Sequence, residues 1–165
     1  MGKFEISLKR FGKKAVLVEW PSLVTIDILD DVIAFRHQLN GRFYKVEMVS
    51  AYNSLLIIFP ALVDFDSISA TIKTLYNAPR LKATAVKRLW KIPVCYENGF
   101  GIDMAEFAKA KNTTPEEIIK MHTAPVYTIF CIGFLPGFMY LGGLDKMLYQ
   151  PRRSEPRLEI PQGSV

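Results

Sequence analysis

An α+β fold is predicted by three features of the sequence. Residues 15–95 alternate between apolar segments of strand length and segments with helical spacing. Their order is strand, helix, strand, strand, helix, strand, and two short helical segments and a Pro- and Gly-rich β-type region follow Tyr96. The sequence therefore predicts a ferredoxin-like βαββαβ domain over residues 1–88. Residues 89–165 are predicted to form a helical connector and the first strands of a β-barrel or sandwich.

The first four elements have clear boundaries. Residues 15–20 (AVLVEW) follow a turn at residues 11–14, stop at Pro21, and predict a strand. Residues 26–39 place apolar side chains at spacings of three and four, which predicts a helix ending near Asn40 and Gly41. Residues 44–49 and 54–59 predict two strands that form a hairpin through a turn at residues 51–53.

The remaining elements of the first domain are a helix and a strand. Residues 66–76 carry Ile68, Ile72 and Leu75 on one face, and Asn77 and Pro79 close this helix. Residues 89–95 (LWKIPVC) predict the last strand, and Pro93 favours an edge position.

Two short helices are predicted next. Asp103 is the expected N-cap of a helix through Lys111, and Thr114 caps a second one with Pro115 in its first turn and Glu117 at its third position. The pair superficially resembles a helix-turn-helix. A DNA-reading helix would not present Glu116 and Glu117 at its N-terminus, so a packed connector is preferred.

The amino-acid composition indicates which partners and which cellular location to expect. The net charge is +5, but Lys and Arg are spread along the chain, so we expect no nucleic-acid partner. Apolar runs are shorter than the roughly 20 residues of a spanning helix, and the N-terminus lacks a signal-peptide pattern, so we expect no membrane partner and a cytoplasmic location. Cys95 and Cys131 are expected to be buried free thiols, and no metal site is predicted.

The segment GFLPGFMYLGGL, residues 133–144, is a candidate binding loop. Its glycines allow close approach of the backbone to a ligand, and its aromatic side chains could form a wall. A tight barrel turn whose aromatics fill a core explains the same residues equally well.

The segment PRRSEPRLEIPQGS carries three arginines between prolines. Guanidinium groups suit bidentate contact with a carboxylate or phosphate, so an anionic ligand is predicted. The alternative is a solvated loop in which the arginines pair with Glu155 and Glu159. His122, at the end of a predicted helix, is a secondary candidate for acid or base chemistry, whereas His37 is expected to be exposed. No Walker A, GxGxxG, GxSxG or HExxH pattern occurs.

Three segments together resemble one family. IPVCYENGFGIDMAEFA, EEIIKMHTAPVYTIFCIGFLPGFMYLGGLD and PRRSEPRLEIPQGSV are similar to the B subunit of 5-oxoprolinase, a family also called allophanate hydrolase subunit 1 or the sporulation-kinase-inhibitor family. The resemblance implies a ferredoxin-like domain followed by a cyclophilin-like β-barrel. It also implies ATP-dependent cleavage of 5-oxoproline to L-glutamate, with ATP and Mg used by a complex that includes the 5-oxoprolinase subunits C and A.

Two other functions stay open within this resemblance. One is inhibition of a sensor histidine kinase, and the other is a carboxyltransferase role on a urea- or allophanate-like substrate. Family members continue beyond the PQGSV motif, so the barrel is expected to be incomplete here and the chain to be a fragment.

The resemblance also implies a set of site residues. The arginines are expected to hold the 5-oxoproline carboxylate or a phosphorylated intermediate, the Gly-rich loop is expected to shape the pocket, and His122 is the candidate catalytic residue. The predicted substrate- or anion-binding residues are Arg152, Arg153, Arg157, Phe134, Pro136, Gly137, Tyr140, Pro161, Gly163 and Ser164.

Overall fold

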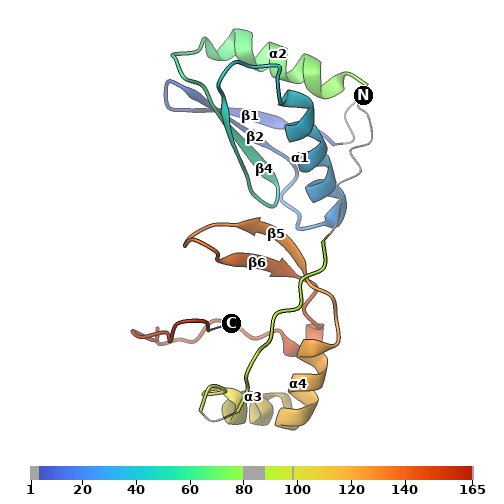
Figure 1. Ribbon diagram of the computed structural model, residues 1–165, viewed down its shortest axis with the longest axis vertical. Helices are drawn as coiled ribbons and strands as arrows, with labels where there is room; N and C mark the ends of the chain where they lie inside the picture. Colours follow the sequence, from blue (N-terminus) through green and yellow to red (C-terminus); the bar gives the residue numbers. More distant parts are fainter. Residues whose placement is uncertain (1–3, 80–87, 98, 165) are drawn as a thin grey trace. The chain divides into compact units, whose positions relative to one another are not determined.

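The computed structural model describes residues 4–79, 88–97 and 99–164, and Figure 1 shows its helices and strands. The chain divides into two compact units, residues 1–92 with 128–142 and residues 93–127 with 143–165. The described residues form a mixed α/β structure with antiparallel sheets and four α-helices. The domain bounds expected from the sequence, 1–88 and 89–165, stay a prediction. No described helix is both long enough and apolar enough to cross a membrane.

A four-stranded antiparallel sheet organises the first unit. Its strands are arranged in the order β1-β2-β4-β3, and helices α1 and α2 pack on one face of it (Figure 1). The elements are β1 (Ser7–Phe11), β2 (Ala15–Glu19), α1 (Ile26–Leu39), β3 (Glu47–Ser50), β4 (Ser54–Ile58) and α2 (Phe65–Asn77). The predicted first strand, both helices and the β3–β4 hairpin are confirmed. Thr25 caps α1 by accepting a hydrogen bond from the Ile28 backbone N–H at 3.3 Å.

The edge of the sheet beside β2 differs from the prediction. Residues 89–95 form no strand, and β1, which the sequence pattern does not predict, pairs with β2 instead. β1 reaches β2 through a local turn in which Gly12 has a φ of 68°, a conformation that glycine adopts without a steric cost. Such a short loop closes at a low entropic cost, whereas residues 89–95 would have to return over a long connection.

The exposure of Cys95 is a consequence of this difference. Both are free thiols, as expected, but Cys95 is exposed because its segment is irregular, and the expectation of a buried Cys95 is wrong. Cys131, on the strand β5 (Thr128–Ile132), is half-buried and so is not the fully buried thiol that was expected.

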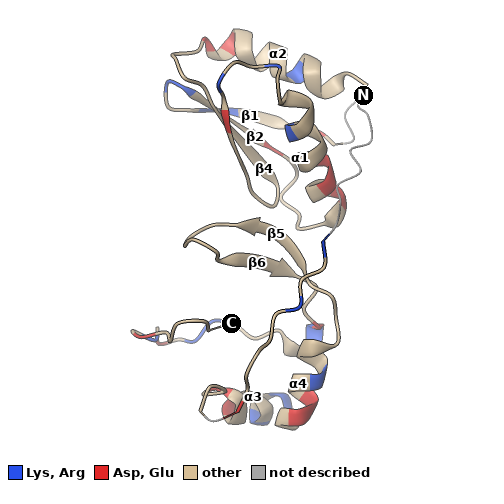
Figure 2. Cartoon of the chain, in the orientation of Figure 1, with Lys and Arg blue, Asp and Glu red and all other residues tan. Residues whose placement is uncertain are grey.

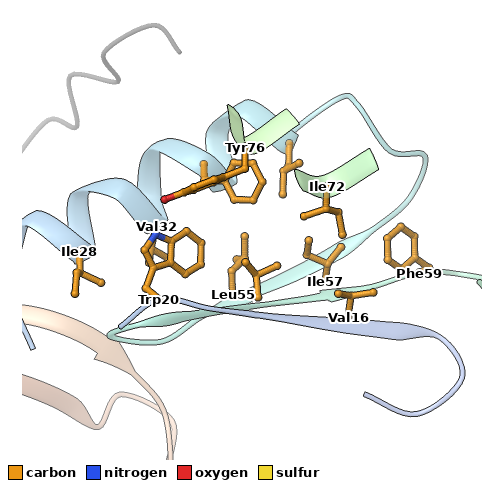
Figure 3. Packing of buried hydrophobic residues seen from close by; sticks show 12 residues of the cluster. Val16, Trp20, Ile28, Val32, Leu55, Ile57, Phe59, Ile72 and Tyr76 are labelled. Atoms are coloured by element: carbon orange, nitrogen blue, oxygen red, sulfur yellow. The ribbon is translucent and has the colours of Figure 1, made fainter. Parts of the chain in front are cut away.

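The core of the first unit lies between the sheet and its two helices. Alternate residues of β2 and β4 point toward α1 and α2, as Figure 3 shows for Val16, Leu55 and Ile57. Burial of each such side chain stabilises the fold by about 1.5–3 kcal/mol. The buried side chains of this cluster are Val16, Val18, Trp20, Ile28, Val32, Phe35, Leu39, Leu55, Ile57, Phe59, Ile72 and Tyr76.

One carboxylate lies within this core. The Asp31 side chain, on α1, accepts hydrogen bonds at its Oδ2 atom from Trp20 Nε1 at 2.7 Å and from Tyr76 Oη at 2.6 Å. Buried charges need such partners, because an unpaired one would be strongly destabilising. The network therefore ties the end of β2 to both helices.

The second unit is built on two short helices. α3 (Met104–Lys111) and α4 (Pro115–Thr123) are confirmed, and the 3-10 helix η1 (Lys146–Leu148) packs on them. Thr114 Oγ1 accepts from the Glu117 backbone N–H at 3.3 Å, as a helix N-cap does. The buried cluster consists of Ala108, Ile118 and Leu148, which is much smaller than the core of the first unit.

The region expected to begin a barrel is represented by one hairpin. β5 (Thr128–Ile132) pairs antiparallel with β6 (Met139–Gly142), and the register shifts between Ile129 and Cys131. Phe130 is the buried residue of this hairpin, and its ring covers Gly142, where a Cβ atom would collide with it.

Candidate functional site

His122 lies in the last turn of α4, where the ring is half-buried. The helix places it there because Thr114 and Pro115 define its first turn and Ile118 anchors it on Ala108 and Leu148. The position at the helix end agrees with the sequence prediction. His37 is exposed on α1, as expected.

Two tyrosines hold His122. Its Nδ1 atom lies 2.5 Å from the hydroxyl oxygen of Tyr96, with the two rings nearly perpendicular at 88°. The Tyr127 hydroxyl donates to the His122 backbone carbonyl at 2.7 Å, and its ring lies 5.6 Å from the imidazole. This carbonyl is one of the last of the helix, so Tyr127 also satisfies an acceptor that the helix leaves open.

Burial raises the pKa of both tyrosine hydroxyls. For Tyr96 desolvation is the cause, and for Tyr127 desolvation comes first, followed by the charges of Tyr96 and Asp145. Both hydroxyls therefore stay protonated at neutral pH and remain hydrogen-bond donors. Sequence reasoning missed both residues, because nothing in the local pattern indicates that Tyr96 meets a histidine 26 positions away.

Two of the three predicted arginines bind carboxylates of α3. Arg157 makes a bidentate contact with Asp103, through Nη2 to Oδ1 at 2.7 Å and Nη1 to Oδ2 at 3.0 Å. Arg153 Nη1 lies 3.1 Å from Asp103 Oδ1 and also 3.1 Å from Glu106 Oε2. Two guanidinium groups therefore converge on one carboxylate (the Asp103 cluster: Asp103, Glu106, Arg153 and Arg157).

This cluster changes two expectations. Asp103 begins α3 as predicted, but its side chain makes no capping hydrogen bond, because both oxygens bind the arginines. A solvated loop would pair the arginines with Glu155 and Glu159; their ion pairs among the described residues are with Asp103 and Glu106 instead. Arg152 is exposed and makes no ion pair within the described part of the chain.

The charges of the cluster stabilise one another. The hydrogen bond from Arg157 is the main reason that the pKa of Asp103 is lowered, with the charges of Arg157 and Arg153 adding to it. The same carboxylate raises the pKa of Arg157. Basic and acidic residues are interspersed on α3 and α4 (Figure 2), so the pairing is local and these helices present no continuous basic surface.

The Gly-rich segment forms the turn between β5 and β6. The backbone N–H of Gly133 donates to the Phe138 carbonyl at 3.0 Å, and Pro136 and Gly137 lie at the tip, where Gly137 has a φ of 83°. Phe134 also has a positive φ, 65°, which is unusual for a bulky residue.

The aromatic residues of this turn do not fill a core in the structure. Phe134 is 83% exposed, and Phe138 and Tyr140 are each 45% exposed. Their rings form a ladder, with centroids 5.8 Å apart from Phe134 to Phe138 and 5.2 Å apart from Phe138 to Tyr140. A binding loop and a core-filling barrel turn both stay predictions for this segment.

The last predicted site residues form a turn near the end of the described chain. The Ser164 backbone N–H and hydroxyl both donate to the Pro161 carbonyl, at 3.2 and 2.7 Å. Gly163, with a φ of 82°, lies within that turn. All three residues are exposed.

The predicted site residues belong to both units. Phe134, Pro136, Gly137 and Tyr140 are part of the first unit, and His122 and the arginines are part of the second. A hollow of about 460 Å³ flanks α4 in the second unit, lined by Glu117, Lys120, Met121, Ala124, Pro125, Gly143 and Asp145. No group of three or more His, Cys, Asp or Glu in the described chain is arranged to hold a metal ion.

Known proteins identify the family. A family model described as the carboxyltransferase domain, subdomain C and D, matches residues 6–165. A protein from Haemophilus influenzae that is named as the B subunit of 5-oxoprolinase is 37% identical over 154 residues, covering 93% of this chain and 72% of that protein. A protein of the same name from Bacillus subtilis is 48% identical over 79 residues, covering 48% of this chain and 33% of that protein.

A solved structure supports the fold. The crystal structure of the protein TTHA0988 matches with a TM-score of 0.73 at 24% identity, over 90% of this chain and 29% of that one. This likeness concerns the fold alone, whereas the sequence matches extend over nearly the whole of residues 6–165. The chain therefore belongs to the family of carboxyltransferase domains, subdomains C and D, and within it to the proteins of the 5-oxoprolinase B-subunit type.

Proposed function

We propose that this chain acts as the B subunit of an ATP-dependent 5-oxoprolinase, which cleaves 5-oxoproline to L-glutamate together with subunits C and A. The observation that carries the proposal is the 37% identity to a 5-oxoprolinase B subunit across 93% of the chain. ATP and Mg belong to the assembly in this proposal, because the sequence contains no local nucleotide-binding motif.

The proposal includes the finer fold assignment. A ferredoxin-like N-terminal domain is supported by the β1-β2-β4-β3 sheet with two helices on one face, in which β1 takes the edge that the last strand would occupy. The β5–β6 hairpin is proposed as the start of a cyclophilin-like barrel.

The arginines are proposed to hold the carboxylate of 5-oxoproline or a phosphorylated intermediate. The ion pairs with Asp103 support this role, because the guanidinium groups of Arg153 and Arg157 both bind that one carboxylate. Arg153 and Asp103 are 53% and 46% exposed, and an ion pair at such a site contributes about 0–1 kcal/mol. A substrate carboxylate can therefore displace Asp103 at little cost, and Arg152 offers a further cation.

Separate roles are proposed for the other predicted residues. The exposed ladder of Phe134, Phe138 and Tyr140 is proposed to present an apolar surface to a ligand. His122 is proposed to act on the reacting amide through its imidazole ring.

Reconstitution tests the activity. Purified chain is mixed with verified subunits A and C of the same organism, ATP, Mg and 5-oxoproline, and glutamate is measured. We expect glutamate to form only when all three proteins and ATP are present. No glutamate from partners that are active with a different B subunit would overturn the proposal.

Arginine substitutions test the anion site in the same assay. Arg153→Ala with Arg157→Ala should raise the KM for 5-oxoproline several-fold, because the double variant removes both guanidinium groups that would bind the substrate carboxylate. Arg42→Ala is the matched control, because Arg42 is an exposed arginine of the first unit. An unchanged KM in the double variant would remove these arginines from the site.

A further inference from the structure

The geometry at the end of α4 points to a role for Tyr96 that goes beyond the predicted site. We propose that Tyr96 is a positioning residue that holds His122 in the tautomer with its proton on Nε2, so that His122 presents a hydrogen-bond donor to the lactam carbonyl of the substrate. The tautomer is a property of this chain alone. Its use in the reaction rests on the proposed function.

The distance between the two groups carries the first step. Tyr96 Oη and His122 Nδ1 lie 2.5 Å apart, so one of them donates a hydrogen bond to the other. A neutral imidazole has a single N–H group, and a phenol has a single O–H group. The direction of this one hydrogen bond therefore decides which ring nitrogen carries the imidazole proton.

Counting donors decides the direction. If Tyr96 donates, its proton is used and the lone pair of Nδ1 is satisfied. If Nδ1–H donated instead, the hydroxyl proton of Tyr96 would need a second acceptor, and the described residues supply none. Donation by Tyr96 therefore satisfies both groups within the protein, whereas donation by Nδ1 does not. Donation from the Tyr96 hydroxyl to Nδ1 is therefore favoured, and this arrangement places the proton of the neutral His122 ring on Nε2.

The acidity of the two groups agrees with this direction. A phenol loses a proton far more readily than a neutral imidazole N–H does, so the phenol is the natural donor of the pair. Burial raises the pKa of Tyr96, which keeps its hydroxyl protonated over the whole neutral range. The donor is thus available whenever His122 is neutral.

Tyr127 restricts the backbone and the ring of His122. Its hydroxyl donates to the His122 carbonyl at 2.7 Å, and its ring packs against the imidazole at 5.6 Å. His122 is therefore held at its backbone by Tyr127 and at Nδ1 by Tyr96. The Nε2 atom has no partner in the part of the chain that the structure describes, so it is the atom left for a ligand.

The chemistry of the proposed substrate fits this donor. Opening of a lactam places negative charge on the carbonyl oxygen, and a fixed N–H group aimed at that oxygen stabilises the charge without reorganisation. The same Nε2–H group could not act as a base in its neutral form. The structure thus assigns His122 the role of a hydrogen-bond donor, and it assigns Tyr96 the role of the residue that fixes the tautomer of His122.

Nitrogen NMR of the full chain tests the tautomer directly. The protein contains only two histidines, so ¹⁵N-histidine labelling yields one signal set for His122 and one for the exposed His37, which serves as an internal reference. Above the protonation range we expect His122 to show a protonated Nε2 and an unprotonated Nδ1. A protonated Nδ1 in the wild-type protein overturns the proposal.

Two tyrosine variants separate positioning from folding. Tyr96→Phe should remove the tautomer preference and make the His122 signals resemble those of His37. Tyr127→Phe, which leaves Nδ1 untouched, should keep the preference. Unchanged His122 signals in a folded Tyr96→Phe protein contradict the assignment. If Tyr96→Phe fails to fold, the wild-type signals and the Tyr127→Phe variant still decide the outcome.

The reconstituted assay then tests the use of the donor. Tyr96→Phe should lower kcat by at least about tenfold, a part of the roughly 10²–10³-fold that loss of one oxyanion-stabilising donor costs, while the KM for 5-oxoproline changes little. An unchanged kcat together with the expected NMR result overturns the role of the donor in the reaction. Absence of glutamate with the wild-type chain instead contradicts the proposed function, and the tautomer is still decided by NMR.

Discussion

Phe134 combines an unfavourable backbone conformation with an exposed side chain. At a φ of 65° a residue with a Cβ atom is strained by roughly 1–2 kcal/mol, and glycine is not. The ring is 83% exposed and contacts Phe138, so the side chain contributes little burial in return. Strain at an exposed residue supports the proposal that Phe134 contacts a ligand.

Substitution of Phe134 should therefore leave stability nearly unchanged. We expect the free energy of unfolding of Phe134→Gly to stay within about 1 kcal/mol of wild type, because relief of strain offsets the lost ring contact. Phe130→Ala, in the same hairpin, is the comparison: its ring is only 9% exposed, and its loss should cost about 3 kcal/mol. Urea denaturation measures both. A loss for Phe134→Gly as large as that for Phe130→Ala would show that Phe134 is a structural residue.

At the scale of elements, the Asp103 cluster attaches the arginine segment to α3. The pKa of Asp103 is lowered in the folded chain, above all by the hydrogen bond from Arg157. A lowered pKa means that the attachment is present above the usual value of 3.8 and is lost as the pH falls through the folded value. At neutral pH the attachment is therefore fully formed.

Asp103→Asn should release the segment at neutral pH. We expect lower backbone NMR order parameters in residues 151–164 of this variant, because the asparagine carries no charge to hold the two guanidinium groups. Asp30→Asn, at an exposed position of α1, is the control and should leave those order parameters unchanged. In the wild type, the carboxyl ¹³C signal of Asp103 should titrate with a midpoint below 3.8. Equal order parameters in both variants would contradict the attachment.

Most helices and strands of the chain could be predicted from the sequence. Both helices of the first unit, the β3–β4 hairpin and the cap at Thr114 follow from local signals, namely apolar spacing, turn residues and capping residues. β1 was missed because Ser7–Phe11 contains only two large apolar residues, Leu8 and Phe11. Residues 89–95 have strand-like composition, but a strand also needs a free edge, and β1 already occupies the one beside β2.

The sequence could indicate candidate site residues to the same extent. His122 and the arginines could be proposed because their side-chain chemistry is visible in the sequence, and their role in a site stays a prediction. Their partners could not be proposed, because the 54 positions between Asp103 and Arg157 and the 26 between Tyr96 and His122 follow no helical or strand periodicity. Such pairs depend on how irregular segments run in space, which local patterns do not encode.

At the scale of the whole molecule, the two units have very unequal cores. Among the residues that the structure describes, the first unit buries a cluster of twelve residues between a sheet and two helices, and the second buries a cluster of three residues between short helices. Helices as short as α3 and α4 are marginal in water without tertiary packing. Because stability depends on buried apolar area, the proposed donor His122 lies on the less stable unit.

This inequality predicts the order of opening. Amides of β2, β4 and α1 should exchange slowest, and those of α3 and α4 should exchange faster under native conditions. Ile118→Ala should abolish protection in α3 and α4 while the sheet stays protected, because Ile118 is one of only three buried residues in its cluster. Leu55→Ala, at a fully buried position of β4, should instead lower protection in the sheet and in α1 and α2, at a cost of about 2–5 kcal/mol. Hydrogen exchange followed by mass spectrometry distinguishes the two patterns. If Ile118→Ala lowered protection equally in all elements, the two units would unfold as one, and the stability of the His122 site would depend on the sheet.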